Sequence, residues 1–174
     1  MTTLNPRSER RRALLLAVGI AVALLSVMPR IERTARASGR TVLAVFVAKD
    51  SGLQNLKMNE LRRIFTNADD SGFSGERNVP FNHTAHSSDR VGFDQTVLHM
   101  SPEEVSRFWI DRKIRGLPGP PRAVDSLSQL LRLVSRMTGG IGYAKPDQVT
   151  PEVRVIRIDG KLPNDPSYPL NFSE

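Results

Sequence analysis

The sequence predicts an α/β domain in which a mainly parallel sheet is flanked by helices, preceded by an apolar N-terminal segment. Short β-branched apolar runs alternate with segments of helical periodicity, an order typical of α/β sandwiches. The first run, residues 41–48, is apolar almost throughout, as in a strand covered on both faces. About 137 residues follow the first 37, which is enough for one domain with one core.

The N-terminal segment has the organisation of an export signal. Three arginines, residues 10–12, precede sixteen almost wholly apolar residues, 13–28, and Ala35-Arg36-Ala37 has the form of a cleavage site. Sixteen helical residues rise about 24 Å, less than the roughly 30 Å hydrocarbon core. We expect residues 1–37 to be a signal peptide or a retained signal anchor. The folded domain, 38–174, would then be periplasmic or elsewhere in the cell envelope, either released or held to the inner membrane through residues 13–28.

Charge and cysteine content exclude several classes of function. Residues 1–37 carry seven arginines and two glutamates, so that the chain's net charge of +7 leaves only about +2 for the remainder. The surplus thus belongs mainly to the export segment, and we expect no nucleic-acid partner. The chain has no cysteine, which excludes disulfides and thiolate metal sites.

The first half of the domain is predicted to hold two strands and a helix. After the strand over residues 41–48, helical spacing over residues 56–65 places Leu56, Leu61, Ile64 and Phe65 on one side. Residues 67–78 are rich in Asp, Ser and Gly and are predicted to be a loop. A short strand follows at residues 79–81, where Pro80 indicates a sheet edge.

Three further helices have recognisable start signals. Ser87 or Ser88 can cap a helix that runs to about His99. Residues 101–104 (SPEE) combine an N-cap serine, proline at the first helical position and glutamate three residues after the cap. That helix should reach residue 112 and bury Val105, Phe108 and Trp109.

The last third of the chain is predicted to end the fold with a helix and two strands. Residues 116–121 (GLPGPP) are predicted to be a loop. A helix opens at Asp125 or Ser126 and runs to residue 137, where two glycines end it. The runs 141–144 and 153–158 are predicted to be strands, followed by a turn at Asp159-Gly160.

Several segments stand in a familiar order. They are LKMNELRRIF (56–65), SSDRVGF (87–93), GGIGYA (139–144) and the closing stretch 153–170. Together they resemble the phosphate-type substrate-binding proteins of bacterial ABC transporters, especially the short members of the periplasmic-binding-protein type 2 superfamily. The second segment takes the place of that family's Ser-Gly-Thr-Arg-x-x-Phe.

This resemblance implies a periplasmic-binding-protein-like lobe that binds phosphate or another oxyanion. It also implies an envelope or ABC-transporter membrane partner, no cofactor and no catalysis. Two departures stand out. The family has two lobes with the anion between them, whereas this chain resembles one lobe plus return segments. In addition, Asp89 occupies the family's threonine position, where its charge would repel an anion.

The candidate anion-binding residues are Ser87, Ser88 and Arg90, with Ser51 as a weaker candidate on a second loop. A helix start offers unsatisfied N–H groups and the positive end of the helix dipole, and Arg90 adds a charge-assisted donor. The alternative is that a serine merely caps the helix, Asp89 complements the dipole, and Arg90 is solvated or pairs with Asp89.

Metal and enzyme sites are not expected. His83, His86 and Asp89 are spaced by three, which would bring them together on a helix. Pro80 and the later cap indicate a loop instead, so the spacing does not predict a metal site. No nucleophile elbow or triad can be assembled. The sequence therefore predicts an exported solute-binding-like protein. The alternative is an accessory module that has lost ligand binding but still contacts another envelope protein.

Overall fold

The computed structural model describes residues 39–66 and 77–173. The predictions for residues 1–37, and for nearly all of the loop after residue 66, lie outside these ranges. Residues 36–174 form a compact unit. Within the described residues, no helix combines the length and the apolar character needed to cross a bilayer.

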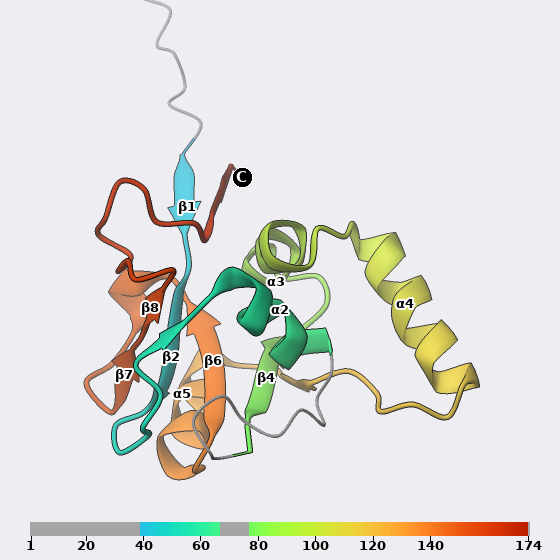
Figure 1. Cartoon of the computed structure of the whole chain (residues 1–174), viewed down its shortest axis with the longest axis horizontal. Coiled ribbons are helices and arrows are strands. Elements are labelled where there is room, and N and C mark those ends of the chain that lie inside the picture. The colour runs from blue at the N-terminus through green and yellow to red at the C-terminus, as the bar shows by residue number, and fades with distance from the viewer. Residues whose placement is uncertain (1–38, 67–76, 174) are drawn as a thin grey trace, which may run out of the picture. The chain divides into compact units, whose positions relative to one another are not determined.

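A five-stranded sheet forms the centre of this unit, in the order β5-β4-β6-β2-β7 (Figure 1). The strands are Ala44–Ala48 (β2), Val79–His83 (β4), Arg122–Val124 (β5), Gly140–Ala144 (β6) and Val153–Val155 (β7). β4 pairs in parallel with β5 and β6, whereas β2 pairs antiparallel with β6 and β7.

The sheet is therefore mixed, where we expected a mainly parallel one. Four strands share one direction, and β2 runs against them between β6 and β7. The expectation failed because a strand covered on both faces has the same apolar pattern in either direction. The prediction that both faces of β2 are covered is confirmed, since all five of its residues are buried.

Helices cover both faces of the sheet (Figure 1). One face carries α2 (Met58–Thr66), α3 (Ser88–Phe93) and the π-helix η2 (Asp94–Leu98), and the other carries α5 (Leu127–Arg136). The core on the first face includes Val45, Val47 and Tyr143, and that on the second includes Phe46 and Val134. Among the described residues, both cores lie within the 36–174 unit, so this unit has a hydrophobic core of its own, as a domain that can fold alone has.

Short strands and helical turns complete the unit. They are β1 (Arg40–Val42) paired with β9 (Asn171–Ser173), β3 (Asn55–Leu56) paired with β8 (Arg157–Ile158), and the 3-10 helix η3 (Pro146–Gln148). β1 joins β9 antiparallel, so the first and last described segments lie side by side. Asp159 and Gly160 both have positive φ, which confirms the predicted turn.

Pro80 lies in an interior strand rather than at the sheet edge. β4 is bordered by β5 on one side and β6 on the other. The pairing with β5 begins only at Phe81, after Pro80 has paired with Ile141 of β6. Pro80 therefore stands where one side of β4 has no ladder, and its missing N–H costs no inter-strand hydrogen bond.

The predicted helix starts are confirmed by their caps. Ser87 accepts from the Arg90 N–H and Ser126 from the Gln129 N–H. The helix α4 (Pro102–Ile114) has a complete capping box, in which the Ser101 hydroxyl accepts from Glu104 and the Glu104 carboxylate accepts from Ser101. Such a box stabilises a helix start by about 1 kcal/mol.

The predicted burial of α4 is only partly confirmed. Val105 is buried, but Phe108 and Trp109 are half-buried. The helix extends to one side of the sheet (Figure 1). Its apolar side chains therefore have less of the domain to pack against than those of α5, in which three residues are buried.

Candidate functional site

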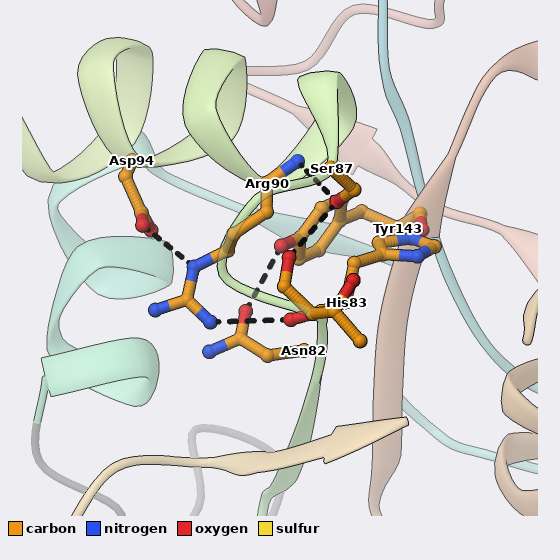
Figure 2. Close-up of polar contacts among 7 residues, drawn as sticks. Asn82, His83, Ser87, Arg90, Asp94 and Tyr143 are labelled. Carbon is orange, nitrogen blue, oxygen red and sulfur yellow. Dashed lines mark hydrogen bonds and ion pairs between the residues drawn. The ribbon is translucent and has the colours of Figure 1, made fainter. Parts of the chain in front are cut away.

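The predicted anion-binding turn lies where β4 leaves the sheet and α3 begins (Figure 2). β4 ends at His83, and Ser87 caps α3 four residues later. The Ser87 hydroxyl accepts from the Arg90 N–H at 3.2 Å and donates to the Thr84 carbonyl at 3.1 Å. Ser87 is therefore engaged as a cap, as the alternative interpretation of the sequence expected.

Arg90 is buried and forms an ion pair that the sequence analysis did not identify. Its Nε donates to Asp94 Oδ2 at 2.6 Å, and the two residues are only 7% and 5% exposed. Its Nη1 also donates to the His83 carbonyl at 3.4 Å. Arg90 thus pairs with Asp94 rather than with Asp89, and it joins the start of α3 to the end of β4 (Figure 2).

Burial has the largest effect on the pKa of Asp94. Loss of water raises the pKa of this carboxyl, and the neighbouring Arg90 guanidinium opposes that rise only in part. Its Oδ1 is buried and has no hydrogen-bond partner among the described residues. Asp94 therefore takes up a proton more readily in the folded domain than in the unfolded chain.

This difference predicts how stability depends on pH. Because the folded-state pKa of Asp94 lies above its ordinary value of 3.8, its contribution to stability grows as pH falls from that raised pKa toward 3.8. We expect Asp94→Asn to remove this gain, measured as the change in urea midpoint between neutral pH and about pH 5.

The matched control for that measurement is Asp165→Asn. Asp165 is partly exposed, and hydrogen bonds from Ser167 lower its pKa. Asp165 stays ionised over this pH interval in both the folded and the unfolded state. Asp165→Asn should therefore show the same change in urea midpoint as the parent protein. An equal effect of the two substitutions would show that Asp94 is not the titrating group.

An aromatic stack lies next to the turn. The Tyr143 ring stacks on Phe93 with centroids 3.9 Å apart and planes 7° from parallel. Its hydroxyl donates to Asn82 Oδ1 at 2.9 Å, and its carbonyl oxygen lies 2.8 Å from His83 Nε2 (Figure 2). Burial raises the pKa of Tyr143 above its usual range, so the phenol stays neutral and acts as a donor.

The structure does not bring the predicted donors into one cavity. Ser88 lines a cavity of about 360 Å³ with Gly92 and Phe172, whereas Arg90 borders a different one of about 290 Å³. Each residue of a helix is rotated by about 100° from the one before, so Ser88 and Arg90, two residues apart, point about 200° apart, toward nearly opposite sides. The two side chains are separated for this reason.

Ser51 is separated further. β2 runs antiparallel to β6, and β6 runs parallel to β4. The loops that follow β2 and β4 therefore leave from opposite ends of the sheet. Ser51 follows β2, and its hydroxyl accepts from the Leu53 N–H at 3.2 Å. The expectation that Ser51 faces the same site as Ser87 is wrong, because the direction of β2 was not evident from the sequence.

The cavity beside Arg90 is a site that the sequence analysis missed. Its lining includes no carboxylate and consists of Ala85, Arg90, Pro102, Val105, Ser106, Trp109, Pro120, Pro121 and Ala123. The Trp109 indole Nε1 is buried and has no acceptor among the described residues. Since indole N–H is a donor only, the residues that line this cavity supply a cation, a hydroxyl and an indole whose buried N–H is unused.

Trp109 was expected to be a core residue, and no signal in the sequence pointed to its polar atom. The ion pair of Arg90 did have a signal, because its carboxylate partner lies four residues later on a helix. Asp89 is also paired, with its Oδ1 3.9 Å from the Lys145 Nζ. The repulsive charge expected beside an anion is thus partly offset.

No metal centre is evident in the part of the chain that the structure describes. No group of three or more His, Cys, Asp or Glu side chains is placed there to hold an ion. His83 contacts the Tyr143 carbonyl and the edge of the Tyr143 ring. The His83 Nε2 therefore contacts the protein backbone next to the turn.

The fold is similar to solved substrate-binding proteins of phosphate ABC transporters. An ABC-type phosphate transport receptor from Vibrio cholerae superposes with a TM-score of 0.61 at 18% identity, over 77% of this chain and 55% of the receptor. A putative phosphate ABC transporter substrate-binding protein from Clostridium perfringens, solved with bound phosphate, gives 0.56 at 19% identity, over 72% and 48%. The chain thus spans about half the length of these proteins. No family profile and no curated sequence matches it.

Proposed function

We propose that this chain is an exported, single-lobe solute-binding protein that binds an inorganic oxyanion in the cavity beside Arg90. Phosphate is the oxyanion that we propose first. The fold likeness supports the class of protein, and the names of the similar structures include phosphate transport and bound phosphate. In this proposal the leader carries the domain across the inner membrane, and uptake through an ABC-type membrane partner follows. The mass of the native N-terminus decides whether the leader is cut.

The donors at the Arg90 cavity are the observation that carries the proposal. Arg90 offers a guanidinium, Ser106 a hydroxyl and Trp109 an N–H without an acceptor, with no carboxylate in the lining. An oxyanion supplies acceptors that such donors lack, and its hydrogen bonds to a cation are stronger than neutral ones. The unpaired Trp109 N–H is the feature that a purely structural role of the cavity leaves unexplained.

Asp94 limits the affinity that this site can reach. Its carboxylate lies 2.6 Å from the Arg90 Nε and compensates the positive charge when ionised. Protonation of Asp94 leaves Arg90 uncompensated, so anion binding should strengthen as pH falls. Sulfate is the suitable probe for this dependence, because it keeps its charge over the interval in which phosphate gains a proton.

A fluorescence titration tests the proposal directly. Trp109 is the chain's only tryptophan, so its emission reports on this cavity. We expect phosphate or sulfate to change the emission of the 38–174 domain in a saturable way. Asp94→Asn should tighten the binding of both ions.

Calorimetry tests the role of the indole N–H. We expect Trp109→Phe, which keeps an aromatic ring but removes the donor, to weaken binding about tenfold, as loss of one hydrogen bond to a charged group predicts. Ser88→Ala is the matched control, since Ser88 lines a different cavity. The absence of any saturable response to either ion would reject the proposal and leave the accessory module as the remaining function.

A further inference from the structure

The chain from Val105 to Arg122, which we name the α4 arm, carries three of the four large hydrophobic residues that are exposed in the described part of the chain. Its large hydrophobic side chains Ile110, Ile114 and Leu117 are 56%, 80% and 46% exposed. Met137, at 36%, is the only other exposed large hydrophobic residue among those described. Isolated exposed apolar residues are ordinary, whereas a cluster of them marks an interaction surface.

The same arm has a net positive charge. Its sequence holds five basic residues, Arg107, Arg112, Lys113, Arg115 and Arg122, against the single acidic residue Asp111, a net of +4. Residues 38–174 together carry only about +2. The rest of the domain is therefore slightly acidic, and the basic charge lies around the exposed isoleucines and leucine.

Internal contacts hold the arm in shape without covering its apolar tip. The Arg112 guanidinium lies 5.7 Å from the centroids of both the Phe108 and the Trp109 rings. Its Nε also donates to the Pro118 carbonyl at 3.2 Å, which ties the loop back to the helix. With the capping box at the other end, the arm is ordered before it meets any partner.

We propose that the α4 arm docks on a bilayer surface that contains anionic lipid. In this arrangement Ile114 and Leu117 enter the headgroup region, while Arg107, Lys113 and Arg115 contact lipid phosphates. Apolar side chains flanked by basic ones have this affinity in monotopic proteins. Charge complementarity favours the bilayer over a second copy of the chain, because self-association would bring two arms of +4 together.

The position of Ile114 outside the depression of the arm favours a bilayer over an acidic peptide. A peptide would use the concave side of the arm, a depression of about 580 Å³ lined by Trp109, Ile110, Lys113 and Leu117 among others. Ile114 is outside that lining and is the most exposed hydrophobic residue of the four. A dependence of docking on Ile114 therefore separates the two partners.

The test is co-sedimentation of the 38–174 domain with vesicles of phosphatidylcholine alone or mixed with phosphatidylglycerol. We expect binding to the mixed vesicles that weakens in high salt. Arg107→Glu combined with Lys113→Glu should weaken it at least about 25-fold, taking about fivefold for each basic residue near the surface. Ile114→Ser should weaken it about tenfold.

The matched controls lie on α5. Arg132→Glu with Arg136→Glu changes the net charge equally at exposed positions away from the arm. Met137, the C-cap of α5, is the exposed large hydrophobic residue outside the arm in the described part of the chain, and Met137→Ser removes it. Both controls should keep binding within about twofold. Equal losses in arm and control variants would overturn the proposal, as would the absence of binding to the mixed vesicles.

Two other outcomes would reassign the arm. Failure to bind vesicles, together with binding of a synthetic Glu/Leu-rich peptide that Leu117→Ser reduces and Ile114→Ser does not, would assign the depression to a protein partner. A dimer in analytical ultracentrifugation that Ile114→Ser abolishes would assign the arm to self-association. These readouts need no oxyanion, so they are independent of the proposed function.

Discussion

Arg90→Ala should lower the free energy of unfolding by about 3–5 kcal/mol, the loss expected when one partner of a buried ion pair is removed. Asp94 is only 5% exposed, and without Arg90 its carboxylate loses the guanidinium that pairs with it. Such a loss is a large part of the roughly 5–15 kcal/mol that stabilises a typical domain. Urea unfolding at neutral pH measures it, and the deficit should shrink at lower pH as Asp94 takes up a proton.

Arg115→Ala provides the matched control for this loss. Arg115 and Asp111 have the same spacing of four residues and a similar distance, 3.0 Å, but their side chains are 67% and 55% exposed. An exposed pair of this kind contributes about 0.5 kcal/mol or less. The double variant Arg90→Met/Asp94→Leu should recover most of the stability, because apolar residues can replace a buried pair. A loss below about 1 kcal/mol for Arg90→Ala would contradict the buried ion pair.

Gly139→Ala should destabilise the domain by roughly 3 kcal/mol. Gly139 has φ of +77°, a conformation that costs an L-residue about 1–2 kcal/mol. A Cβ there would also overlap the carbonyl oxygen of Arg77, and overpacking against backbone adds about 1–3 kcal/mol. Gly139 joins α5 to β6, and its carbonyl accepts from the Val79 N–H at 2.8 Å, so a shift would disturb the start of β4.

Gly160→Ala separates the two contributions. Gly160 has the same φ of +77°, but a Cβ there would meet nothing within 4 Å. We expect this variant to lose only the conformational part, about 1–2 kcal/mol. Chemical denaturation of both variants gives the comparison. Equal losses at the two glycines would mean that the close approach of Arg77 to Gly139 does not constrain the fold.

The helix starts and the buried strands could be predicted from the sequence because their causes are local. The capping box joins Ser101 and Glu104 across three residues, and the caps at Ser87 and Ser126 are equally short in range. The resemblance to phosphate-type substrate-binding proteins was likewise found from short segments in order. The structural similarity to such proteins confirms it at the level of the fold.

The site could not be predicted in the same way, because it depends on which segments meet. Ser51 lies at the far end of the sheet since β2 runs against β4. Arg90 of α3 and Trp109 of α4 line one cavity only because both helices meet the segment 120–123 there. Nothing in the sequence around Arg90 or Trp109 indicates that the two side chains line the same cavity.

By itself, the sequence determined the apolar character of residues 13–28, the helix caps, the doubly covered strand β2 and the order of segments that indicates the fold. Only the tertiary structure decided the direction of β2, the partner of Arg90 and the exposure of Ile110 and Ile114. The physical reason is range. Caps and periodicity act within a few residues, whereas strand direction, cavities and exposed faces follow from packing between segments distant in the chain.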